Sequence, residues 1–185
     1  ISRKSRKKIL NQLSKRAYYL TRIAKTFSSK RFIEVGTAEG WQYFTFCKYV
    51  RDNFEDGAVY TCDPRDVRDK KYITEFKDER FQYIQGTSKD IAATGIFADF
   101  FYIDGLHDEG TVIRDVINLE GCQSKDGLAT WVFDDFDLRF GCAQDIMTLS
   151  QLSKSFKVYN IGDTASGHPS HQVIVRGHFK GENSQ

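Results

Sequence analysis

The sequence lacks the features that would assign it to a membrane, secreted or zinc-binding class of protein. No stretch reaches the roughly 18 consecutive apolar residues of a membrane-spanning helix, and no signal-peptide pattern stands near its start. The cysteines form no CxxC pair, which argues against a zinc site; they are Cys47, Cys62, Cys122 and Cys142. We therefore expect reduced thiols in a cytoplasmic protein.

Acidic residues are absent from residues 1–30, which hold ten Lys and Arg. Residues 31–185 hold seventeen bases and twenty-five acids, so a segment of +10 precedes a body of −8. Apolar residues at helical spacing predict that this segment is a basic amphipathic helix lying on the body; they are Leu10, Leu13, Ala17, Leu20, Ala24 and Phe27. Its basic face is either a solvated surface or a contact for an acidic partner, such as nucleic acid, anionic lipid or an upstream domain.

Short apolar runs alternate with amphipathic segments through residues 31–185, without an internal repeat or a linker, so this part is expected to form one domain. The predicted strands are 31–36, 58–63, 81–86, 99–104, 130–135, 157–162 and 172–177, and the predicted helices are 40–53, 66–78, 88–95, 108–120 and 141–154. This alternation predicts an α/β fold with a doubly wound, mostly parallel seven-stranded sheet. The last two strands are expected to form an antiparallel hairpin, whose loop carries His168 and His171, either as substrate contacts or as plain surface residues.

Two of the predicted strands end in acidic residues. ADFFYIDGLHDEG at 98–110 delivers Asp104 and His107, and TWVFDDFD at 130–137 delivers Asp134 and Asp135, to one edge of the sheet. Each acid alone is typical of a helix cap or a turn. Three converging carboxylates repel one another unless a cation lies between them, so the set predicts a site for Mg²⁺ or Ca²⁺.

The first three strands end in residues suited to a nucleoside. FIEVGTAEG at 32–40 turns through Gly36 and enters a helix near Gly40, although it is not a GxGxxG motif. Asp63 follows Gly40 by 23 residues, close to the spacing of a ribose-binding acid, while its alternative role is to cap the next helix. Gly86, Thr87 and Ser88 either border an adenine or form an ordinary helix start.

These motifs resemble those of the class I S-adenosylmethionine-dependent methyltransferases over about residues 31–177, through EVGTAEG, the acid of TCDP, YIQGTS and the terminal hairpin. Within that superfamily, IDGLHDEG together with VFDDF is similar to the metal-dependent small-molecule O-methyltransferases, the macrocin-type sugar methyltransferases and their relatives. The resemblance implies an S-adenosylmethionine-dependent O-methyltransferase whose acceptor is a hydroxyl of a sugar, a polyol or a phenolic molecule.

The resemblance also implies roles for individual residues. The cofactor would be bound by Glu34, Gly36, Thr37, Gly40, Asp63, Gly86, Thr87, Ser88 and Asp104. Mg²⁺, or Ca²⁺ or Mn²⁺ in its place, would be held by Asp104, Asp134 and Asp135, and His107 would serve beside Asp104 as the catalytic base. The chain departs from many relatives in having Leu106 where they carry an acidic or small residue, and the lid segments of longer relatives have no evident counterpart.

Two other functions remain open at this point. A metal-dependent hydrolase could use the same acids, and it would have no need of Asp63 or Gly36. A noncatalytic adaptor could combine a degenerate cofactor fold with the basic segment, and it would bind an acidic partner without turnover.

Overall fold

The computed structural model of the chain describes residues 16–125, 128–151, 156–163, 169–177 and 179. The strands are β1 (Arg31–Val35), β2 (Ala58–Asp63), β3 (Phe81–Gln85), β4 (Phe100–Ile103), β5 (Thr130–Phe133), β6 (Phe156–Asp163) and β7 (Pro169–Arg176). The helices are α2 (Trp41–Asn53), α3 (Lys70–Glu75), α4 (Ser88–Ala92), α5 (Thr111–Leu119) and α6 (Cys142–Gln151), with a 3₁₀ turn at Glu120–Cys122. A further helix precedes β1 at residues 16–26.

All seven strands lie in one sheet of order β3-β2-β1-β4-β5-β7-β6. β1 to β5 pair in parallel, whereas β7 is antiparallel to both β5 and β6. The predicted doubly wound sheet with a C-terminal antiparallel hairpin is therefore confirmed. The strand order reverses between β1 and β4, and the carboxyl edge at such a point is where ligands bind in open α/β sheets.

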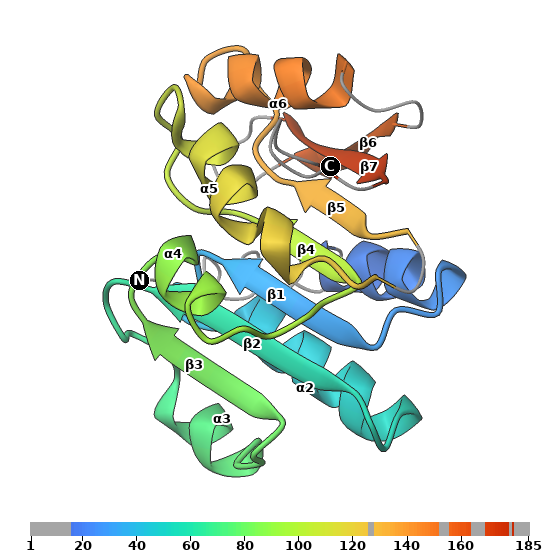
Figure 1. The fold of residues 1–185 in the computed structure, drawn as a ribbon, viewed down its shortest axis with the longest axis vertical. Coiled ribbons are helices and arrows are strands. Elements are labelled where there is room, and N and C mark those ends of the chain that lie inside the picture. Colours follow the sequence, from blue (N-terminus) through green and yellow to red (C-terminus); the bar gives the residue numbers. More distant parts are fainter. Residues whose placement is uncertain (1–15, 126–127, 152–155, 164–168, 178, 180–185) are drawn as a thin grey trace.

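The sheet is the middle of three layers (Figure 1). One face is covered by α4, α5 and α6 through a cluster that includes Ile91, Val116 and Ile146. The other face is covered by α2, α3 and the helix at 16–26, whose Leu20 and Ala24 are fully buried in a second cluster. β4 and β5 are buried along their whole length, because helices cover both faces. Among the described residues, no helix is long and apolar enough to cross a membrane.

The N-terminal helix lies on the body as its apolar spacing predicts, over the residues that are described. Ala17 of the helix and Phe27, in the turn directly after it, are partly buried. Leu10 and Leu13, which belong to the same predicted stripe, lie outside the described residues, as does His168 of the hairpin loop.

Several predicted boundaries are wrong in detail. α3 begins at Lys70 rather than at residue 66, because the Asp69 side chain accepts a hydrogen bond from the amide of Lys71 (2.9 Å) and caps the helix there. α5 begins at Thr111 rather than at residue 108, since Gly110 adopts a left-handed φ of +79°. The hairpin strands are longer than predicted, with β7 starting at Pro169 rather than at residue 172.

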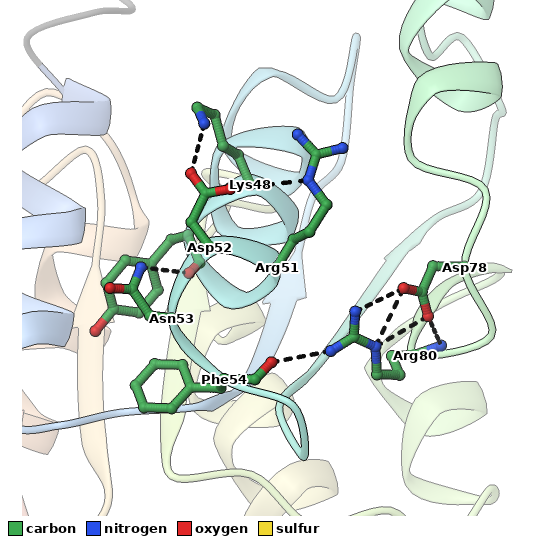
Figure 2. Close-up of polar contacts among 8 residues, drawn as sticks. Lys48, Arg51, Asp52, Asn53, Phe54, Asp78 and Arg80 are labelled. Atoms are coloured by element: carbon green, nitrogen blue, oxygen red, sulfur yellow. Dashed lines mark hydrogen bonds and ion pairs between the residues drawn. The ribbon is translucent and has the colours of Figure 1, made fainter.

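The opposite end of the sheet is tied together by polar contacts. Arg80, just before β3, donates to the carbonyl of Phe54 at the end of α2 (3.0 Å) and to the carboxylate of Asp78 (2.7 Å), as Figure 2 shows. Lys48 and Asp52 pair one turn apart on α2 (2.5 Å). The Arg80 contact ties the end of α2 to the segment before β3, at the end of the sheet opposite the carboxyl edge.

Candidate active site

At the centre of the carboxyl edge, the backbone segments that follow β1 and β4 lie in close contact. Val35 and Ile103 are register partners in β1 and β4, so Gly36 and Asp104 leave the sheet side by side. A Cβ atom on Gly36 would lie 1.9 Å from the carbonyl oxygen of Asp104, and the glycine has a φ of +92°. Only glycine fits this position, which explains the turn after β1.

A cavity of about 520 Å³ opens at this edge beside Gly36. Six of the nine residues predicted to bind the cofactor line it: Gly36, Asp63, Gly86, Thr87, Ser88 and Asp104. The other three, Glu34, Thr37 and Gly40, are absent from its lining. They support the loop instead, because the Gly40 amide donates to the carbonyl of Thr37 (2.8 Å) and starts α2.

Glu34 ends a buried chain of hydrogen bonds behind this loop. The Thr61 hydroxyl donates to Glu34 Oε2 (2.5 Å), and the two hydroxyl oxygens of Thr37 and Thr61 are 2.6 Å apart. Since Thr61 has one hydroxyl proton, Thr37 must be the donor to Thr61. Burial raises the pKa of Glu34 to about 8, and the Thr61 hydrogen bond offsets only part of this effect.

Asp63, at the end of β2, faces the cavity with a fixed carboxylate. Its Oδ2 accepts from the amide of Ala38 (3.0 Å), and its Oδ1 accepts from the amide of Arg65 (2.9 Å). Each oxygen keeps a further lone pair, so the group can accept two more hydrogen bonds from a ligand. This is the geometry expected of an acid that binds a pair of vicinal hydroxyls.

The far side of the cavity contains two polar residues, Asp115 and Asn118, that the sequence analysis missed. Ser88 donates to Asp115 Oδ1 (2.6 Å), and Asn118 Nδ2 donates to the Ser88 hydroxyl (2.9 Å); all three line the cavity. Burial raises the pKa of Asp115. Residues 111, 115 and 118 share one face of α5 by helical spacing, and this was the signal available in the sequence.

The predicted acidic cluster divides into two parts in the structure. In the buried part, Arg16 Nη1 lies 2.7 Å from Asp134 Oδ2 and 3.3 Å from Asp104 Oδ2. The Tyr102 hydroxyl is near the same two oxygens, at 2.5 Å and 3.1 Å respectively. The cation that lies between these carboxylates is therefore Arg16 of the N-terminal helix, which the sequence analysis counted among the basic residues without assigning it a role.

The charges of this buried part depend on one another. Burial, followed by the charge of Asp134, raises the pKa of Asp104 well above its ordinary value, while Arg16 opposes the increase. Burial also raises the pKa of Asp134, again against Arg16. Burial by itself would lower the pKa of Arg16, but Tyr102 and the two carboxylates outweigh it and raise that pKa. Arg16 therefore stays charged, and the two acids share its charge.

The more exposed part of the cluster consists of Asp104, His107 and Asp135. One potential ligand atom from each lies within 4.8 Å of the others. His107 Nε2 is 2.9 Å from Asp135 Oδ2, and the imidazole packs against the ring of Phe140 with centroids 4.8 Å apart. The hydrogen bond to Asp135 raises the pKa of His107. Burial would raise the pKa of Asp135, but the hydrogen bond and charge of His107, together with the charge of Arg16, lower it overall.

Backbone contacts fix the position of the His107 loop. Its carbonyl accepts from the amide of Cys142 at the start of α6 (2.9 Å). The buried Asp145 of α6 accepts from the amides of Gly110 (2.9 Å) and Val112 (3.0 Å), so it caps α5 from outside. Asp135 itself has a φ of +52°, an uncommon value for a residue other than glycine, which turns its side chain toward His107.

The comparison with protein families decides which fold family this is. Residues 33–136 match the family described as "Methyltransferase domain", and the match spans more than half of the chain. The chain belongs to this methyltransferase family. The resemblance to class I S-adenosylmethionine-dependent methyltransferases is thereby confirmed. No curated protein sequence matches the methyltransferase.

Solved structures share the whole fold of this methyltransferase at low identity. An O-methyltransferase from Bacillus cereus in complex with SAH is 12% identical, with a TM-score of 0.69 over 95% of this chain and 92% of that one. TomG, an O-methyltransferase from Streptomyces achromogenes in complex with SAM, is 14% identical, with a TM-score of 0.67 over 88% and 79%. The N-methyltransferase NodS from Bradyrhizobium japonicum is 11% identical, with a TM-score of 0.68 over 91% and 98%. Since oxygen and nitrogen methyltransferases share this fold, the fold leaves the acceptor atom open.

Proposed function

We propose that this methyltransferase transfers the methyl group of S-adenosylmethionine to a hydroxyl oxygen of a small molecule such as a sugar, a polyol or a phenolic compound. The observation that carries the proposal is the position of Asp104, which lines the cavity and also belongs to the Asp104–His107–Asp135 cluster. Methyl transfer is an in-line displacement, so the acceptor oxygen must lie directly behind the sulfonium methyl group. A donor cavity that adjoins a proton-accepting cluster is suited to this reaction.

The cavity residues fit the parts of the cofactor. Its volume of about 520 Å³ lies within the usual range for small-ligand sites. Asp63 would accept the two ribose hydroxyls, and Ser88 with Asp115 would border the adenine. Gly36, whose missing side chain leaves the backbone accessible, would lie along the methionine part with Glu34 behind it.

A divalent cation fits the exposed part of the acidic cluster. Asp104 and Asp135 offer the oxygen ligands that Mg²⁺ prefers, with Ca²⁺ or Mn²⁺ as alternatives, and His107 is within reach of the same place. When bound, such a cation would stabilise the negative charge that develops on the acceptor oxygen. Asp134, the third acid of the predicted ligand set, is engaged by Arg16 and Tyr102.

His107 is placed to take the proton of the acceptor. Its Nε2–H donates to Asp135, so the Nδ1 atom of the neutral ring is the proton acceptor. The side chain is 42% exposed, which leaves it accessible to a substrate. Asp135 orients the ring and stabilises the imidazolium that forms.

The test is transfer of labelled methyl groups from S-adenosylmethionine to a panel of sugars, polyols and catechols, together with amines of similar size. Each hydroxyl acceptor is paired with its methoxy analogue, in which the reacting oxygen is blocked. We expect product only with free hydroxyls, and more product with Mg²⁺ than with a chelator. Transfer to amines but not to hydroxyls would refute the choice of acceptor, and equal rates with chelator would refute the role of the cation.

We further propose a reducing, cytoplasmic setting, which is supported by four buried and unpaired cysteines. We also propose that the basic residues of segment 1–30 bind an acidic partner. Six of the ten Lys and Arg of this segment lie in residues 1–15, outside the described part of the chain. Binding to anionic vesicles or nucleic acid that weakens with salt would support such a partner, and salt-independent or absent binding would refute it.

A further inference from the structure

Arg16 reaches the active site because of its place on the N-terminal helix. Residues 16, 20 and 24 lie one turn apart on the same side of that helix. Leu20 and Ala24 are fully buried in the core against the sheet, and Arg16, one turn before Leu20, brings its guanidinium to the carboxyl edge. When this helix packs on the sheet, it therefore also places the positive charge of Arg16 at the carboxyl edge.

The guanidinium occupies the inner side of the acidic cluster. Asp104 Oδ2 and Asp134 Oδ2 both lie against Arg16 Nη1, at 3.3 Å and 2.7 Å. The side chain of Asp134 is fully buried, and its Oδ1 has no hydrogen-bond partner among the described residues. A buried carboxylate oxygen without a partner is costly, and it is a ready ligand for a cation that can reach it.

Two cation positions therefore adjoin one another at Asp104. The inner one, between Asp104 and Asp134, contains Arg16, and the outer one is formed by Asp104, His107 and Asp135. A monovalent charge in the inner position repels a divalent cation in the outer one, and it also withholds Asp134 from the ligand set.

We propose that Arg16 is an internal counter-cation that keeps Asp134 out of the metal site and sets the cation affinity of the methyltransferase through the docking of its N-terminal helix. This inference rests on the proposed function in one respect, the divalent cation at Asp104 and Asp135. Arg16 acts through the two carboxylates that it holds, so it is a positioning residue.

The experiment is a calorimetric titration of Mg²⁺ into the full chain, without cofactor or acceptor. Arg16→Gln removes the charge, and the matched control is Arg22→Gln, an exposed arginine on the same helix. We expect Arg16→Gln to bind Mg²⁺ roughly tenfold more tightly than the wild type, because a repulsion is lost and Asp134 becomes a ligand. Arg22→Gln should stay within about twofold of the wild type.

Substitutions of the acids separate this proposal from a simple three-aspartate site, and they remain informative if Arg16→Gln fails to fold. With Arg16 in place, Asp134→Asn should weaken the Mg²⁺ affinity clearly less than Asp135→Asn, which removes a ligand and should weaken it roughly tenfold or more. In the Arg16→Gln background, adding Asp134→Asn should reverse the gain in affinity.

The proposal is overturned if Arg16→Gln binds Mg²⁺ no more tightly than the wild type, or if Asp134→Asn weakens binding as much as Asp135→Asn. Failure of the proposed function is a separate result, since it would appear as a wild type that does not bind S-adenosylhomocysteine. The comparison of Mg²⁺ affinities needs neither the cofactor nor the acceptor, so it tests the role of Arg16 whether or not the wild type binds S-adenosylhomocysteine.

Discussion

Glu34→Gln is expected to remove a pH dependence of stability that originates beneath the loop after β1, which contains Gly36 and Gly40. Glu34 is 1% exposed and accepts a hydrogen bond from Thr61 at 2.5 Å. Burial raises its pKa from the ordinary 4.5 to about 8, with a further small increase from the charge of Asp63. Glutamine has nearly the same size and can accept the same hydrogen bond, but it does not titrate.

The sign follows from the direction of the pKa shift. Because the pKa of Glu34 is higher in the folded chain, the folded state binds this proton more tightly than the unfolded state does. Its stabilising contribution is fully present below the unfolded pKa of 4.5 and is lost as pH rises toward the folded pKa of about 8. At about 1.4 kcal/mol per pH unit, the wild type should lose roughly 3 kcal/mol by pH 7 and roughly 5 kcal/mol above pH 9.

Urea unfolding of the wild type and Glu34→Gln between about pH 5 and 9 measures this difference. The matched control is Glu39→Gln, an exposed glutamate on the same loop, which should follow the wild type at every pH. The reasoning is refuted if the stability of Glu34→Gln falls with pH as steeply as that of the wild type.

Three further predictions concern the loop, the base and the N-terminal segment. Gly36→Ala should lower the free energy of unfolding by roughly 3 kcal/mol or more, because the new Cβ would lie 1.9 Å from the Asp104 carbonyl oxygen. The control Gly95→Ala, at a φ of +70° with no neighbour within 4 Å, should lower it by only about 1 kcal/mol. Equal losses for the two variants in urea unfolding would contradict the close approach at Gly36. His107→Ala should lower kcat by roughly 10²–10⁴-fold while calorimetry finds the affinity for S-adenosylhomocysteine unchanged, and a loss below about threefold would exclude a base role. Deletion of residues 1–8 should leave that affinity unchanged, because the charged end precedes the apolar stripe of the helix; a weaker affinity would show that the segment covers the cavity.

The fold could be predicted because its signals are local. Each buried strand is a short apolar run, and the runs alternate with amphipathic helices, which leaves the doubly wound sheet as the consistent arrangement. The start of α3 was mispredicted because the prediction did not take account of the Asp69 side chain, which caps the helix just before Lys70.

Much of the candidate site also followed from position along the chain. Asp63 and Asp104 both line the cavity, since parallel strands bring their carboxyl ends to one edge. The role of Arg16 could not be predicted, because its partners lie 88 and more residues away and the charge pattern only indicated an exposed basic face. Asp115 and Asn118 were missed for a related reason, since their contact with Ser88 depends on how α4 and α5 pack.

The central claim is that the cavity beside Gly36 and Asp63 holds the methyl donor. A calorimetric titration of S-adenosylhomocysteine into the wild type, Asp63→Ala and the exposed-surface control Asp52→Ala tests it most directly. The account predicts one binding site in the wild type and the control, and binding weaker by roughly 1–3 kcal/mol in Asp63→Ala, because bound hydroxyls lose their acceptor. No binding to the folded wild type, or an affinity unchanged by Asp63→Ala, would contradict it.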